Sequence, residues 1–110
     1  MAIHLFSSAD ASGLACFVTG RPIQVIPWDQ IDTIRAFHRR DERLEYAVVW
    51  LRVPQKMFPV EFTELDPRWP ELLQGFSRYL RAVVLFEKWF PQEIHPVFEK
   101  NTHGVYSKEA

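Results

Sequence analysis

The side chains best suited to metal or nucleophilic chemistry are scattered along this chain. The histidines are His4, His38, His95 and His103, and no two of them stand at the spacing that puts two metal ligands on one helix or turn. Cys16 lies between Ala15 and Phe17 in an apolar stretch, whereas a reactive thiol needs an exposed, electropositive setting. We therefore expect no metal site, and we expect Cys16 to be buried and inert.

Three carboxylates form a group near residue 64, namely Glu61, Glu64 and Asp66. Paired carboxylates can act as acid and base where burial separates their pKa values. The group also precedes a helix signal, at which Asp66 can cap free N–H groups and Glu64 adds favourable negative charge. We expect this structural role and predict no catalytic residue. No cofactor is predicted, because the glycines lack the lysine and the spacing of a phosphate-binding loop.

Basic residues concentrate between positions 35 and 43. The residues predicted to bind a partner are Arg35, His38, Arg39, Arg40, Asp41 and Arg43. Nearby Phe37 and Tyr46 could stack on bases, but Asp41, Glu42 and Glu45 interrupt the positive charge and disfavour nucleic acid. A protein partner suits this mixture better, because Arg, Trp and Tyr are enriched in interface hot spots. The four tryptophans, Trp28, Trp50, Trp69 and Trp89, either contribute to such a surface or belong to the core.

Composition predicts a single globular domain, residues 1–110. Hydrophobic residues make up 47% of the chain and charged residues 25%, and 110 residues are too few for two separate cores. The formal charge is −1, so no global field attracts phosphate backbones or anionic lipid. No apolar run approaches the length of a membrane span, and the first residues do not resemble a secretory leader. We expect a cytoplasmic protein that binds neither nucleic acid nor membranes.

About five or six short strands are expected before any helix. The strand-like stretches are residues 3–6, 14–18, 23–26, 33–38, 44–53 and 58–62, and residues 7–13 are expected to form a loop. The stretch 44–53 is apolar on nearly both faces, which predicts the central strand. Residues 58–62 alternate as in a half-exposed strand, and Pro59 favours a sheet edge.

One amphipathic helix follows, starting at Asp66-Pro67 and continuing to about residue 81. Gly75 within it indicates either close packing or a bend. Residues 84–90 fit a strand or a short helix, and we favour the helix. An extended C-terminal tail with aromatic anchors is expected after it. This order, strands first and a helix later, predicts an α+β fold.

The stretch Ile26-Pro27-Trp28-Asp29-Gln30-Ile31, within an order of strands followed by a helix, resembles small bacterial pleckstrin-homology-like (PH-like) proteins. The resemblance covers residues 14–80 and implies a PH-like barrel that serves as a binding scaffold. The alternative is an open antiparallel sheet with one helix across a face. Lipid binding is not implied, because Asp10-Ala11-Ser12 carries none of the basic residues on which lipid-binding members rely.

The expected function is that of a non-enzymatic protein-binding domain. The resemblance suggests an immunity protein that binds and neutralises a cognate bacterial toxin. The alternative is a PH-like self-associating scaffold or adaptor subunit, a homodimer that meets its copy through the Pro59 strand or the aromatic tail. An enzyme ranks third.

Overall fold

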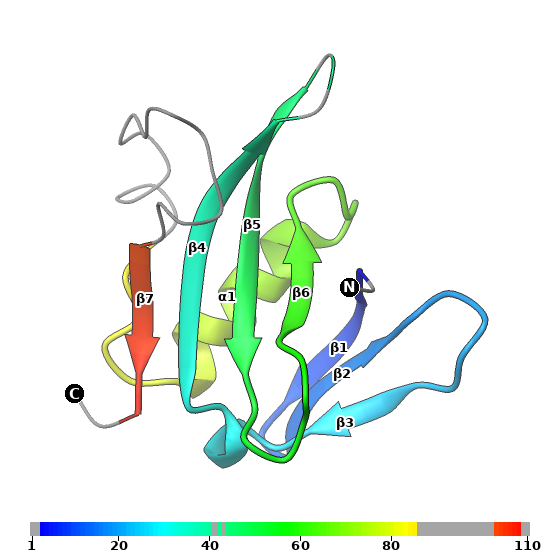
Figure 1. Ribbon diagram of the computed structural model, residues 1–110. Helices are drawn as coiled ribbons and strands as arrows, with labels where there is room; N and C mark the ends of the chain where they lie inside the picture. The colour runs from blue at the N-terminus through cyan, green and yellow to red at the C-terminus, as the bar shows by residue number, and fades with distance from the viewer. Residues whose placement is uncertain (1–2, 41, 43, 86–102, 109–110) are drawn as a thin grey trace.

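The described part of the protein folds as two antiparallel sheets and one α-helix, as the α+β prediction requires (Figure 1). The computed structural model describes residues 3–40, 42, 44–85 and 103–108. Its elements are β1 (Leu5–Asp10), β2 (Gly13–Phe17), β3 (Gln24–Ile26), the 3-10 turn η1 (Trp28–Gln30), β4 (Thr33–Arg40), β5 (Glu45–Arg52), β6 (Val60–Thr63), α1 (Trp69–Tyr79) and β7 (His103–Ser107). Six strands precede the helix, and a seventh follows it.

The smaller sheet has the order β1-β2-β3. The loop expected at residues 7–13 is wrong, because β1 continues to Asp10 and turns directly into β2. Asp10 stabilises this turn by accepting hydrogen bonds through Oδ1 from the backbone N–H groups of Ser12 (2.8 Å) and Gly13 (3.3 Å). Gly13 is required there, since a Cβ would lie 2.6 Å from the carbonyl oxygen of Ile26.

The larger sheet has the order β6-β5-β4-β7, with β4 and β5 paired from Thr33↔Arg52 to Arg40↔Glu45. Strand β5 is buried on both faces, which confirms the predicted central strand. Strand β6 lies at the edge, as Pro59 suggested, but all four of its residues are buried, so the half-exposed pattern is wrong. Ile3 forms a parallel bridge with Glu61 along the free edge of β6. This bridge connects the larger sheet to the segment that leads into β1.

Helix α1 begins at Trp69, two residues later than Asp66-Pro67 predicted. Asp66 does not cap the helix as its N-cap residue. Its Oδ1 accepts the N–H of Arg68 (2.8 Å) and its Oδ2 accepts the N–H of Phe6 (2.8 Å), so this buried carboxylate ties the entrance of the helix to β1. Gly75 marks close packing, since a Cβ there would lie 3.2 Å from the Cβ of Ala9.

The main core lies between the two sheets and α1. It joins one face of each sheet with the apolar stripe of the helix, which buries Trp69, Leu72 and Phe76. Trp28 is also buried, stacks on Tyr79 at 5.1 Å between ring centroids and donates through Nε1 to the carbonyl of Asp10 (2.6 Å). Trp28 and Trp69 are therefore core residues. Trp50 is half-buried, and Trp89 lies outside the described residues.

The C-terminal region holds a strand that the sequence did not predict. Strand β7 pairs antiparallel with β4, and the N–H of Val84 donates to the carbonyl of Val105 (2.9 Å). We expected a short helix at residues 84–90. Residues 84 and 85 are not helical, and residues 86–90 lie outside the described part of the chain. Among the described residues, no helix has the length and apolarity needed to cross a membrane.

Candidate protein-binding hairpin

The β4–β5 hairpin carries most of the residues predicted to bind a partner. Figure 1 shows β4 and β5 extending past the ends of β6 and β7. Alternation along β4 divides these residues between the two faces of the sheet. His38 follows Ile34 and Ala36 on the face toward the core, whereas Arg35 and Arg39 share the outer face with Phe37.

An ion pair braces the outer face of the hairpin. Arg39 donates from both terminal nitrogens to the two carboxylate oxygens of Glu61, each at 2.9 Å, and Trp50 Nε1 donates to Oε1 of Glu61 at 2.7 Å. The Arg39 guanidinium lies over the ring of Phe37. The rings of Phe37 and Trp50 pack edge to face, with 4.9 Å between their centroids. Three strands, β4, β5 and β6, are thereby fixed by side chains as well as by their backbone ladders. We call Arg39, Trp50 and Glu61 the outer brace.

The carboxylate of Glu61 is the charge on which the outer brace depends. Its residue is only 2% exposed, and burial by itself raises the pKa of a carboxyl group. The hydrogen bonds from Arg39 and Trp50, together with the positive charge of Arg39, outweigh this effect and hold the pKa of Glu61 below its ordinary value. Glu61 is therefore ionised at neutral pH, and the brace is closed there.

A second, looser set of charges lies at the hairpin end. The Nδ1 atom of buried His38 is 3.2 Å from Oε1 of Glu45, and the guanidinium of Arg40 is 3.8 Å from Oε2 of the same carboxylate. Arg40 keeps 68% of its side chain exposed. Leu44 and Leu65 belong to two segments that meet near this end, because Ala47 and Glu64 are hydrogen-bonded to each other. Both leucines are more than half exposed.

The predicted partner-binding residues therefore differ in what they can offer. Arg35 and Arg40 are exposed, while His38 and most of Arg39 are turned to partners within the chain. Asp41 and Arg43 lie outside the described residues. Sequence reasoning missed Glu61 as the partner of Arg39. A charged residue between Val60 and Phe62, both apolar, was the available signal, because a buried carboxylate requires a cation or donors.

The carboxylates near residue 64 do not work as a pair. Glu61 belongs to the outer brace, Glu64 accepts the N–H of Ala47 (2.9 Å), and Asp66 holds the helix entrance. Cys16 is fully buried, and burial raises the pKa of its thiol to about 11. Within the described ranges, no three His, Cys, Asp or Glu side chains gather as ligands for a metal ion.

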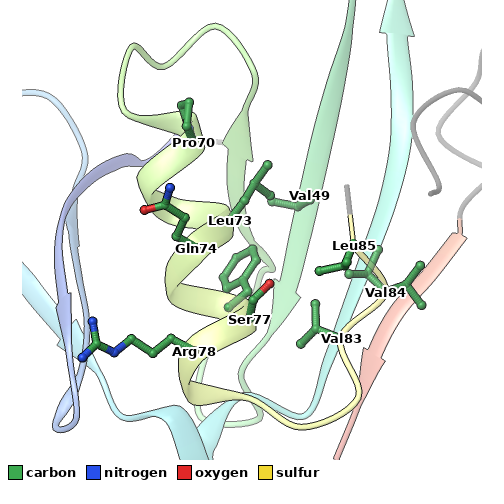
Figure 2. Close-up of a pocket in the computed structure, with 11 residues that line it drawn as sticks. Val49, Pro70, Leu73, Gln74, Ser77, Arg78, Val83, Val84 and Leu85 are labelled. Atoms are coloured by element: carbon green, nitrogen blue, oxygen red, sulfur yellow. The ribbon is translucent and has the colours of Figure 1, made fainter. Parts of the chain in front are cut away.

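An apolar groove of about 490 Å³ lies between α1 and residues 83–85 (Figure 2). Val49, Phe76 and Val105 are buried lining residues, while Leu73 and Val83 are half-buried. Figure 2 shows Gln74 and Arg78 pointing away from residues 83–85. The lining is thus suited to apolar contacts and brings no set of polar groups together that would orient a reacting molecule.

Comparison of the chain with models of protein families, with curated protein sequences and with solved structures found no match in any of the three. The function is therefore inferred from the geometry of the molecule itself.

Proposed function

We propose that this chain is a protein-binding domain whose β4–β5 hairpin end contacts the partner. The observation that carries the proposal is the outer brace, which fixes a protruding hairpin by a bidentate ion pair and an indole hydrogen bond. A surface held rigid before binding loses less conformational freedom on association than a mobile one. The brace therefore favours tight recognition by this end of the molecule.

The exposed side chains of this end combine apolar anchors with charge. Leu44 and Leu65 offer apolar area, and the Arg40–Glu45 pair adds both signs of charge. Protein interfaces combine an apolar centre with a polar rim in this way. Arg35 is exposed opposite Trp50 on the outer face of β4, the other face of the sheet from Arg40 and Glu45, so it is not part of this surface.

Among protein-binding domains, the function we propose is that of an immunity protein that occludes a cognate bacterial toxin. The size of the chain and its resemblance to small bacterial PH-like proteins support this proposal. Inhibitor complexes commonly form with little backbone change in either partner, which agrees with a hairpin fixed in advance.

The experiment is co-expression of the chain with the products of its neighbouring genes, read as survival of the host and as stoichiometric co-purification. We expect one neighbour to be toxic alone and harmless together with the chain. The double variant Arg40→Glu/Leu44→Ser should weaken the complex by about 100-fold, as loss of hot-spot residues does. Arg81→Glu, an exposed charge reversal beyond α1, is the matched control and should protect fully. Protection by no neighbour, or full protection by the hairpin variant, contradicts the proposal.

Self-association through the Pro59 strand is not the function we favour. The edge of β6 is already in contact with the N-terminal segment, since the N–H of His4 donates to the carbonyl of Glu61 (2.8 Å). The aromatic tail named in the same alternative lies mostly outside the described residues.

A further inference from the structure

The smaller sheet has an apolar face on the side that does not belong to the core. Residues opposite each other in a ladder share a face, and alternate residues of a strand point to opposite faces. Leu14 and Cys16 of β2 point into the main core, so the residues between and beside them point to the other side. The apolar side chains that the two ladders place on that other side are Leu5, Ala15, Phe17 and Val25. We call these four residues the second face.

The second face is contiguous and reaches solvent. Leu5 lies opposite Phe17 in the ladder, and both are half-buried, whereas Val25 is 57% exposed. A Cβ at Gly13 would lie 2.8 Å from Cγ1 of Val25, so the side chain of Val25 leans over a strand position that carries no side chain. Ile23, two positions before Val25, is 59% exposed and continues this face by alternation. A continuous apolar surface therefore meets water.

The residue pattern of β2 and β3 is typical of strands that are covered on both sides. An antiparallel sheet with one solvated face normally alternates apolar and polar residues. Strand β2, with the sequence Gly-Leu-Ala-Cys-Phe, places no charged or amide side chain on either face. In β3 the polar residue Gln24 lies opposite Cys16 on the core side, while Val25 points outward. Contiguous apolar area of this kind marks an interaction site.

The two ends of the second face carry charges of opposite sign. Asp10 pairs with Gly13 at the start of β2 and is exposed on this face. Arg21 lies in the connection from β2 to β3, beyond the other end of the strand, and is also exposed. A uniformly acidic or basic partner would meet one favourable and one unfavourable end. A second copy turned end for end brings Asp10 of each molecule toward Arg21 of the other, so the surface is complementary to itself.

We propose that the second face is the interface of a homodimer in which the two smaller sheets pack face to face. Packed sheets lie about 10 Å apart, and the side chains of the facing surfaces interdigitate. The two-fold axis runs across the strands near the middle of β2, so the strands of the two copies run in opposite directions. Figure 1 shows the smaller sheet far from the end of the β4–β5 hairpin, so this interface goes beyond the proposed function and does not depend on it.

The test is analytical ultracentrifugation of the full chain over a range of concentrations. We expect a reversible dimer with a dissociation constant on the order of 10 μM, as is typical of a small interface. Val25→Asp places a charge within the interface and should weaken association by about 100-fold. Ile23→Asp changes a residue that precedes β3, so it tests the same surface without altering a strand, and should weaken association by about tenfold.

The charged ends are tested by separate variants. Arg21→Gln should weaken the dimer about threefold and make it less sensitive to salt. Asp10→Asn should have the same effect, because the amide oxygen can still accept the N–H groups of Ser12 and Gly13 and only the charge is lost. Leu65→Asp is the matched control, since Leu65 is 54% exposed but lies at the hairpin end, and this variant should dimerise as the parent chain does.

Four results would overturn the proposal. The first is sedimentation as a monomer up to about 1 mM, a hundred times the expected dissociation constant. The second is a dimer that Val25→Asp and Ile23→Asp leave intact or that Leu65→Asp dissociates, which would place the contact elsewhere. The third is a monomer in which Val25→Asp abolishes protection in the co-expression experiment, which would assign the second face to that partner. The fourth is a monomer that binds phosphatidylcholine vesicles through Val25, which would assign it to lipid. Cooperative thermal unfolding of each variant distinguishes loss of the dimer from loss of the fold.

Discussion

The two faces of the larger sheet are stabilised by different physics, and adjacent residues of β6 show the contrast. Phe62 points into the main core and is fully buried among apolar side chains. Glu61, one residue earlier, points to the outer face, where it is just as inaccessible but meets Arg39 and Trp50. The inner face depends on apolar area removed from water, whereas the outer face combines a smaller apolar cluster of Phe37, Tyr46 and Val48 with one complete set of polar contacts.

This contrast has a practical consequence for substitutions. An apolar core loses stability in proportion to the cavity that remains after a side chain is shortened. A buried ion pair loses most when one partner is removed and the other is left, and much less when both are replaced by apolar groups.

The largest effect is expected for Phe62→Ala. Removal of a fully buried ring from the main core should lower the free energy of unfolding by about 3–5 kcal/mol, because a cavity remains in that core. Urea denaturation followed by circular dichroism measures this change. A loss below about 1 kcal/mol would mean that the core does not close around Phe62.

The next effect concerns the outer brace. Glu61→Ala should cost about 2 kcal/mol, less than the loss of a fully buried pair, because Arg39 keeps 24% of its side chain exposed and can turn to water. The double variant Arg39→Leu/Glu61→Leu should recover most of that loss, as apolar replacement of both partners is often neutral. A loss in the double variant equal to the sum of the losses in Arg39→Leu and Glu61→Leu would show that the pair is not coupled and would remove the contrast between the faces.

A third, smaller effect is the dependence of stability on pH. Because the folded-state pKa of Glu61 is lowered, its contribution is fully present above the unfolded value of about 4.3 and is lost as the pH falls through the folded value. The free energy of unfolding should therefore fall more steeply below about pH 4.3 in the parent chain than in Glu61→Gln. Other carboxylates with lowered pKa, such as Asp10, remain in both proteins and cancel. If the free energy of unfolding fell equally steeply with pH in the parent chain and in Glu61→Gln, the lowered pKa of Glu61 would be contradicted.

The smallest effect lies at the connection beyond α1, outside both faces. Ala82 has φ 56°, a conformation that costs an L-residue about 1–2 kcal/mol, so Ala82→Gly should raise stability by up to about 1 kcal/mol. Ala11→Gly, at an exposed turn position where φ is not positive, is the matched control and should be neutral or slightly destabilising. Thermal unfolding distinguishes the two variants. Equal changes in melting temperature for Ala82→Gly and Ala11→Gly would argue against strain at Ala82.

The sequence predicted those parts of the fold that depend on local patterns. The hairpin of β4 and β5 follows from two apolar runs around a charged tip, and the stripe of α1 follows from its spacing of three and four residues. Strand β7 was missed because His103–Ser107 is short and is defined by its pairing with β4, about seventy residues earlier. The extension of β1 was missed because polar residues 7–10 look like a loop without their partner strand.

Part of the candidate site could likewise be predicted. The basic hairpin was evident from residue types alone, and so was the mixture of charges that favours a protein partner. The different roles of its residues were not evident, since Arg39 belongs to the outer brace only because Glu61, 22 positions later, lies on the same outer face of the sheet. The exposure of Ile23, Val25, Met57 and Phe58 was not predicted either, because these residue types are typical of a core and only the tertiary structure leaves them uncovered.

By itself, then, the sequence determined the class of fold, the central strand, the amphipathic helix and the place where charge gathers. These depend on periodicity and composition, which are properties of neighbouring residues. The tertiary structure alone decided which charges are closed within the molecule and which apolar side chains face water. Both depend on contacts between segments that are far apart in the chain, and no local pattern carries that information.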